Sequence, residues 1–482
     1  MLFLPLLLYA LLAQPGGSSP VASPTTATNT TIPFAALAGS SDVCDSISNC
    51  RTLYNIVWSS LVTILACVWT AVHRNISAPA KAGESRAWHV VARVLEVVKI
   101  VVVTLLVPEW VLAWAVRQSL HARDVGRELE AARAQAQGVW KERGLVSGKK
   151  VVRGSTDSGE VGEDVPLADW RAEQEESLSI LARDEYHVGR LRGKWTTRHG
   201  FFVVMGGFHI YEDGEPMHPL SRYAVLELVK TGDLMPPTAE ELQGWSHGDT
   251  LSKTLAVTQT LWFVIQCIAR RVEHLPITQL EVMTLAYTTI TVAMYVAWWD
   301  KPQNVGCPLR VPVKRQTKPE YVEKVGWYDH IIFTITGGLD LLVDLNKQQR
   351  VPTFYGGSTR GDHNDAYADM TALVVAMVFG AVHCAAWDYA FPSGAEERIW
   401  RISSVCLVAV PGAMLLIIAS FWRMTNIRER FEFVVMLFFF VCVPVYIAAR
   451  ILLLVLSFTS LRSLPYDAYQ TVQWTLRIPH VT

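Results

Sequence analysis

The sequence ISSVCLVAVPGAMLLIIASF, residues 402 to 421, contains no charged side chain. An α-helix rises about 1.5 Å per residue, so about 20 such residues span a hydrocarbon core of about 30 Å. A second apolar run, residues 431 to 458, follows it and is divided by Arg450. These two stretches predict transmembrane helices.

The same pattern recurs along the chain, and Trp and Tyr residues gather near the ends of the apolar runs, as is typical of membrane interfaces. The predicted spans are residues 52 to 72, 94 to 116, 251 to 269, 280 to 299, 371 to 391, 402 to 421 and 431 to 458. The predicted fold class is therefore all-α, a polytopic transmembrane helical bundle of about seven spans with two long extramembrane loops.

Composition supports this class. Of the 482 residues, 51% are hydrophobic and only 18% are charged, and the mean hydropathy is +0.23. These values disfavour an ordinary soluble enzyme and make the lipid bilayer the predicted partner. A net charge of −1 argues against nucleic-acid binding. The eight cysteines include no C-x-x-C pair, so no metal site is predicted, and cofactors and protein partners stay undetermined.

The N-terminus predicts entry into the secretory pathway. Residues 1–13 resemble a signal peptide, and residues 14–51 form a Ser/Thr/Pro-rich segment expected to be lumenal or extracellular. Asn29 begins an Asn-Thr-Thr triplet and is the predicted glycosylation site. Cys44 and Cys50 are expected to form a disulfide, with two free thiols as the alternative. The predicted location is an integral membrane of the secretory pathway, plasma membrane or endomembrane, with a lumenal or extracellular N-terminus.

The remaining chain divides at the spans. The predicted segments are a first transmembrane hairpin at 52–116, a long loop with helical and disordered parts at 117–250, a second hairpin at 251–299, a second long loop at 300–370, C-terminal transmembrane helices at 371–458 and a tail at 459–482.

Lys and Arg in short loops favour the cytosol, and most loops agree with a lumenal N-terminus. The loop after residue 421 is the exception, because in a seven-span chain its arginines would lie in the lumen. An eighth crossing or re-entrant segment at 327–345 would place this loop in the cytosol. The carboxylates in that segment argue against it, since each costs about 3 kcal/mol at a bilayer centre. For the second span, a helix that turns back at Pro108-Glu109 is an alternative to a full crossing.

The two long loops carry further local patterns. Residues 117 to 143 favour a helix, and Gly206-Gly207 in the run 201 to 208 suggests close backbone packing at the membrane surface. The sequence VPTFYGG at 351 to 357 resembles a strand. Asp340 and Asp344 would share one helix face and could bind a divalent cation or share a proton, with a solvated loop helix as the alternative.

Seven stretches of the sequence form a recognisable set: CDSISNCRTLYNIVWSSLVTILACVWTAVH (44 to 73), VPEWVLAWAVRQ (107 to 118), WTTRHGFFVVMGGF (195 to 208), LSKTLAVTQTLWFVIQCIARR (251 to 271), WWDKPQNVGCP (298 to 308), FGAVHCAAWDYAFPSGAEERIWR (379 to 401) and YQTVQWTLRIPHV (469 to 481). Through these stretches the chain resembles an uncharacterised family of fungal multi-pass integral membrane proteins. The resemblance implies membrane architecture and assigns no catalytic residue.

Ionisable side chains inside apolar runs are the candidate functional residues, because charge in a bilayer is costly. Glu109, Glu281, His383 and Arg450 are the binding candidates for a transporter of a small molecule or ion. The alternative is a membrane-embedded enzyme acting on a lipid-like or small hydrophobic substrate, with His383, Asp340 and Asp344 as catalytic candidates. A seven-span receptor is a third interpretation, which the long loop after the second span disfavours.

Overall fold

The computed structural model describes residues 50–79, 85–142, 193–212, 215–245, 250–312, 340, 343–357, 363–423 and 428–472. Over these residues the fold is mostly helical. The helices are α2 (Leu53–Ala71), α3 (Arg86–Leu106), α4 (Pro108–Glu142), α6 (Thr197–Val204), α7 (Arg222–Thr231), α8 (Ala239–Trp245), α9 (Thr250–Val272), α10 (Gln279–Ala297), α12 (Asn364–Cys384), α13 (Gly394–Arg423) and α14 (Arg428–Thr459). The strands are β1 (Phe208–Glu212), β2 (Glu215–Pro219) and β3 (Leu309–Pro312), and 3-10 turns cover Leu345–Lys347, Ser460–Ser463 and Tyr466–Tyr469.

Five helical segments are long and apolar enough to cross a membrane, judged by length and composition. They are Leu53–Ala71, Gln279–Ala297, Asn364–Cys384, Gly394–Ser420 and Phe440–Ser463. The prediction of a helical membrane protein is confirmed at this level. The predicted spans at 94 to 116 and 251 to 269 fall on α3, α4 and α9, which are not among the five, so the number of seven spans stays a prediction.

The predicted span at 94 to 116 is not one helix. The chain leaves helical geometry at Val107, which has φ −143° and ψ 61°, and α4 starts at Pro108. Proline suits a first helical position because its missing N–H would have no partner there. The break lies at Pro108-Glu109, the position at which a helix that turns back was the alternative to a full crossing. α4 then continues to Glu142, which confirms the helix predicted over 117 to 143.

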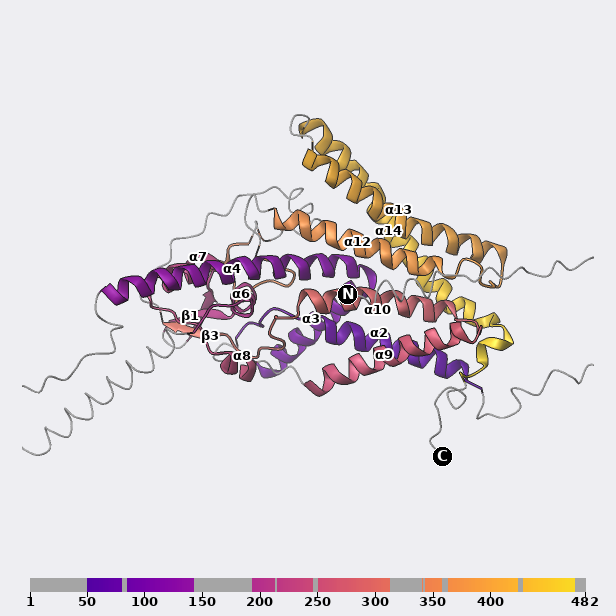
Figure 1. Cartoon of the computed structure of the whole chain (residues 1–482), viewed down its shortest axis with the longest axis horizontal. Coiled ribbons are helices and arrows are strands. Elements are labelled where there is room, and N and C mark those ends of the chain that lie inside the picture. Colours follow the sequence, from indigo (N-terminus) through magenta and orange to yellow (C-terminus); the bar gives the residue numbers. More distant parts are fainter. Residues whose placement is uncertain are drawn as a thin grey trace, which may run out of the picture.

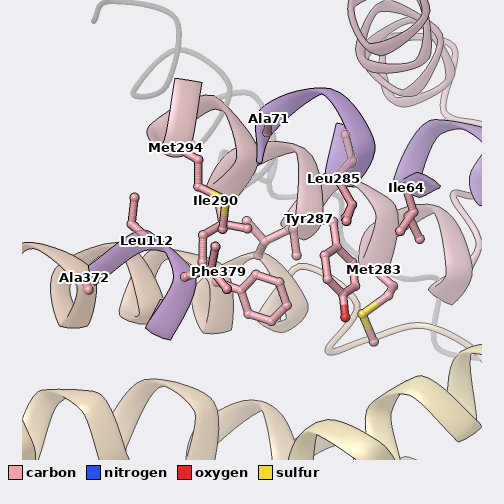
Figure 2. Close-up of a cluster of buried hydrophobic side chains, with 14 of the residues drawn as sticks. Ile64, Ala71, Leu112, Met283, Leu285, Tyr287, Ile290, Met294, Ala372 and Phe379 are labelled. Atoms are coloured by element: carbon pink, nitrogen blue, oxygen red, sulfur yellow. The ribbon is translucent and has the colours of Figure 1, made fainter. Parts of the chain in front are cut away.

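Helix α10 is the centre of the bundle and contacts α2, α4, α12 and α14. It begins with a capping box, in which Thr278 and Glu281 satisfy each other's backbone N–H groups. Figure 1 shows α10 between α12 and α4 on one side and α2 and α9 on the other. Figure 2 shows how Tyr287 of α10 and Phe379 of α12 fill the space between these helices, with their rings edge-to-face at 5.6 Å.

A small α/β unit at one end of α4 corrects the all-α prediction (Figure 1). The strand order is β2-β1-β3, with β1 antiparallel to β2 and parallel to β3. Its apolar core is built from α4, α6, α7 and the strands, and contains Val125, Phe202 and Val225. The loop predicted at 117–250 thus holds an ordered unit. Phe202 is buried in the protein, and a Cβ at Gly207 would lie 2.3 Å from its ring. The close packing predicted at Gly206-Gly207 is confirmed, and the placement of this run at the membrane surface stays a prediction.

The second long loop also differs from expectation. Residues 351 to 357 form no strand, because Phe354 has a positive φ of 71° and lies in a turn that the Tyr355 amide closes on the Pro352 carbonyl. Phe354 packs on the rings of Trp110 and Trp114, with centroid distances of 4.4 and 5.2 Å, and so joins this loop to α4. Most of the alternative span at 327–345 lies outside the described residues.

Candidate functional site

Glu109 and Arg450 form a buried ion pair between α4 and α14. Glu109 lies in the first turn of α4, where the helix dipole favours a negative charge. Tyr446 lies one helical turn before Arg450, and its hydroxyl donates to Glu109 Oε1 at 2.6 Å. Only 8% of Glu109 and 3% of Arg450 is exposed. The structure therefore brings together two of the predicted binding residues, and adds Tyr446.

Aromatic rings enclose the guanidinium of Arg450. Its Cζ lies 4.0 Å from the ring centroid of Phe379 on α12 and 5.4 Å from that of Tyr287 on α10. A cation over an aromatic face is attracted by the ring quadrupole, more strongly where water is excluded. The Tyr287 hydroxyl donates to the carbonyl of Leu105, close to the break between α3 and α4. The site thus joins five helices, α3, α4, α10, α12 and α14.

Part of the hydrogen-bonding capacity of this pair is unused. Within the described residues, Glu109 Oε2 and Arg450 Nε and Nη2 are buried and have no hydrogen-bond partner. A buried polar atom without a partner costs about 1–3 kcal/mol, and more when the group is charged. Native structures contain few such atoms, and functional sites are among the places where they occur. The free N–H groups can bind an anion, and the free carboxylate oxygen can accept a proton.

His383 lies beside this site but does not touch the ion pair. Its ring is 4.8 Å from that of Phe379, the residue that also packs on the guanidinium of Arg450. Nδ1 of His383 is 2.8 Å from the Phe379 carbonyl, and Nε2 is 3.4 Å from Sδ of Met283. Both ring nitrogens therefore have neighbours on α12 and α10, as a structural histidine does.

Glu281, the fourth predicted binding residue, belongs to a different cluster. Its carboxylate binds both Nη atoms of Arg51 and caps α10 through Thr278. The nearby guanidinium of Arg270 donates hydrogen bonds to backbone carbonyls of the C-terminal segment, including that of Ala468. The pairing of Arg51, just after Cys50, was missed by sequence reasoning, because nothing in the pattern relates it to α10. Glu281 ties chain segments together and does not join the Glu109 site.

The catalytic candidates Asp340 and Asp344 do not share a helix face. Asp344 has extended backbone at the start of a 3-10 turn and accepts from the amide of Asn346. The helix that would place it on one face with Asp340 does not continue through Asp344. Asp340 instead accepts from the amide of Gly356, with its two oxygens at 2.8 and 3.0 Å. The predicted shared face is wrong, since each carboxylate caps a different backbone segment.

The structure describes only some of the remaining predicted site residues. Asn29 and Cys44 lie outside the described residues. Cys50 is disulfide-bonded, and the pairing with Cys44 stays a prediction. In the part of the chain that the structure describes, no group of three or more His, Cys, Asp or Glu residues could hold a metal ion.

Lys301 is another buried cation, which sequence reasoning missed. Its Nζ donates to the His73 carbonyl, to Gln118 Oε1 at 2.7 Å and to Asn75 Oδ1 at 3.2 Å. It also lies 4.9 Å from the ring centroid of Trp298. Burial lowers the pKa of Lys301 well below its usual value. With three acceptors for its three protons, Lys301 joins the end of α10 to α4 and is a structural element.

This helical bundle, with five membrane-length helices and an ion pair inside it, defines a helical membrane protein. Residues 31–157 and 168–323 match the model of a family of unknown function, DUF8562, and the chain belongs to that family. The matched residues include Glu109 and end before Arg450. No curated protein and no solved structure matches the chain.

Proposed function

We propose that this chain is a multi-pass membrane protein of the secretory pathway that carries a small anion together with a proton, with Glu109 and Arg450 as the polar centre. One observation carries the proposal. The buried pair has free hydrogen-bonding atoms on both partners, Glu109 Oε2 and Arg450 Nε and Nη2, within the described residues. Ionisable side chains inside membrane helices are functional candidates for this reason.

The chemistry of the pair suggests how proton and anion would be coupled. While Glu109 is ionised, its carboxylate occupies Arg450 and repels an incoming anion. A proton on Glu109 removes that charge and leaves the guanidinium of Arg450 to bind the anion. Tyr446 donates to Glu109, and Tyr287 and His383 are the other titratable groups at the site, on α10 and α12. Binding of one proton and one anion would thus be mutually favourable.

The geometry favours transport over the enzyme alternative. The three catalytic candidates have separate partners: His383 the helices α10 and α12, Asp340 the Gly356 amide, and Asp344 the Asn346 amide. A catalytic acid and base must reach the same substrate atoms, and these three residues do not converge. No feature of the described residues singles out a receptor.

The placement in the membrane belongs to the same proposal. We place the N-terminus in the lumen after removal of residues 1–13, with glycosylated Asn29, seven spans and a cytosolic C-terminus. The resemblance to fungal multi-pass membrane proteins and the Lys and Arg pattern of the short loops support it. Asn75, in the first predicted cytosolic loop, also begins an acceptor triplet, but its Nδ2 donates to the Pro352 carbonyl at 2.9 Å and is engaged inside the protein.

Proton flux into vesicles tests the proposal. The full chain is reconstituted into liposomes that enclose the pH-sensitive dye pyranine, with valinomycin and potassium to clamp the membrane potential. Chloride, inorganic phosphate or sulfate is then added outside. We expect at least one of these anions to acidify the lumen roughly tenfold faster with the wild type than with Glu109→Gln or Arg450→Gln.

Glu128→Gln is the matched control, because Glu128 is an exposed acid on the same helix, α4. It should acidify the lumen as the wild type does. If none of the three anions accelerates acidification beyond that of protein-free vesicles, the proposed function is wrong.

A further inference from the structure

A cavity of about 330 Å³ lies between the end of α2, the middle of α3 and the loop at 304–306. It is remote in sequence from Arg450 and shares no lining residue with the Glu109 site. Part of its wall is apolar, with Val72 directly after α2 and Val97 and Val101 of α3, and part is cationic, with Arg74 and Arg93. The cavity is therefore amphipathic.

The order of these residues along the two helices separates the two sides. Arg93, Val97 and Val101 follow each other at intervals of four residues, so they lie on one face of α3. On the α2 side, Val72 comes before Arg74 in the chain. Both walls thus change from apolar to cationic toward the connection between the two helices, with Arg74 in that connection and Arg93 in the first half of α3. A headgroup at one end and an acyl chain at the other would match this gradient.

The positive charge in the cavity is incompletely compensated. Among the described residues, Arg74 makes only a long hydrogen bond, 3.4 Å, to Asn304 Oδ1, and Arg93 has no ion pair. The nearby carboxylate of Glu96 is already bound by Arg350 and by the Thr353 hydroxyl. Burial lowers the pKa of Arg74, the charge of Glu96 opposes this, and the charge of Arg93 adds to it. The two arginines are thus held together without a carboxylate of their own.

The outer surface beside the cavity is suited to lipid. Trp69, which lines the cavity, is 65% exposed. On α3, the exposed residues Val94, Val98 and Val102 each directly follow a residue that lines the cavity. Large apolar side chains exposed together mark a surface that another apolar phase covers. Tryptophan is enriched at the level of lipid headgroups. In the proposed topology this end of α2 faces the cytosol, where anionic lipids attract Lys and Arg.

We infer that this cavity binds the phosphate headgroup of an anionic phospholipid between Arg74 and Arg93, with the acyl chain along Val97 and Val101. Guanidinium groups bind phosphate oxygens through paired, charge-assisted hydrogen bonds. Asn304 and Ser77 add polar groups at the same end. The inference is separate from the anion path at Glu109 and Arg450, and it shares with that proposal only the placement of the chain in a membrane.

Binding of short-chain lipids to the full chain in neutral detergent tests this inference. The probes are dioctanoyl phosphatidic acid and dioctanoyl phosphatidylcholine, and the readouts are the dissociation constant and the rise in melting temperature. We expect the wild type to bind the phosphatidic acid at least about tenfold more tightly than the phosphatidylcholine. Arg93→Gln should remove most of this preference, and Arg74→Gln with Arg93→Gln should abolish it.

Arg398→Gln is the matched control, since Arg398 is an exposed arginine in another predicted cytosolic loop; it should bind as the wild type does. The melting temperature without lipid shows whether each variant folds, and the exposed position of Arg93 makes Arg93→Glu a second variant that should fold and lose binding.

Three results would overturn the inference. Equal affinity for both lipids, or full binding by Arg93→Glu, would show that the two arginines do not select the headgroup. Inorganic phosphate that competes at the concentration at which the phosphatidic acid binds would assign the cavity to a soluble phosphate compound instead of a lipid. Because these readouts need no anion flux, they can fail or succeed independently of the proposed function.

Discussion

Glu109 and Arg450 are 341 residues apart in the chain and form one ion pair inside the helical bundle. The Tyr446 hydroxyl completes the contact on the side of Glu109 Oε1. The ring of Phe379 covers the guanidinium. The pair joins the helix that follows the break at Val107 to the last long helix, so its two members should depend on each other.

Removing one partner of the Glu109–Arg450 pair should lower the free energy of unfolding more than removing both. Arg450→Leu leaves the Glu109 carboxylate buried without its counter-charge, and we expect the free energy of unfolding to fall by about 3–5 kcal/mol. Combining Arg450→Leu with Glu109→Gln should recover part of that loss, measured by urea unfolding in detergent. Arg462→Leu, at an exposed position, should have little effect. A double variant that loses the sum of both single effects would contradict the coupling.

Gly200 is where α6 approaches α4 most closely. A Cβ at this position would lie 1.9 Å from the carbonyl oxygen of Ala122, and neither backbone can move alone. Gly200→Ala should therefore lower the free energy of unfolding by about 1–3 kcal/mol or more. Gly244→Ala in α8 meets no atom within 4 Å and should be neutral or stabilising by up to about 1 kcal/mol. Equal melting temperatures for the two variants would argue against this packing.

The α/β unit should lose stability in mild acid. Burial lowers the pKa of His199 and of His209 below the ordinary value of about 6.5. Below that pH the unfolded histidines bind protons that the folded ones do not, so the free energy of unfolding falls as the pH drops from about 6.5 toward the lowered pKa values. Melting temperatures at about pH 7.5 and about pH 5.5 measure the loss. Replacing both histidines with Gln should flatten this dependence, and an unchanged slope would contradict the assignment.

Glycosylation mapping tests the orientation of the chain. We expect sugar on Asn29 and none on Asn75, because Asn75 lies in a predicted cytosolic loop and its amide is engaged by Pro352. Asn29→Gln should remove the shift that an endoglycosidase causes on a gel, and Asn75→Gln should leave it unchanged. Sugar on Asn75 would reverse the orientation. A C-terminal reporter in the lumen, instead of the cytosol, would select eight spans.

The sequence predicted the apolar helices well where hydropathy and helix ends agree. For α10, the expected span at 280 to 299 lies close to Gln279–Ala297, since Thr278 caps the helix. For α12, the prediction at 371 to 391 began one to two turns late. The true first turns contain Asp365 and Asp369, which pair with Arg117 of α4 at 3.2 and 2.8 Å. A prediction from hydropathy leaves such acids out of a span, because it does not register a partner that is distant in the chain.

The sheet and the site depend on contacts that no local pattern contains. Strand β2, with the sequence EPMHP, lacks alternating apolar residues, and β3 joins β1 from a distant part of the chain. Glu109 and Arg450 could be recognised as unusual charges in apolar runs, but their pairing could not. Tyr446 precedes Arg450 by one helical turn, so this spacing was the available signal for a third member of the site.

Proton uptake on anion binding tests the central proposal most directly. Chloride, inorganic phosphate or sulfate is added to the purified full chain in weakly buffered solution, and the pH change is recorded together with anion binding. We predict that the wild type takes up about one proton for each anion bound, because the two bind in mutual dependence. Glu109→Gln should bind the anion at least as tightly and take up none. Anion binding without proton uptake by the wild type, or equal uptake by Glu109→Gln, would contradict the role assigned to Glu109 and Arg450.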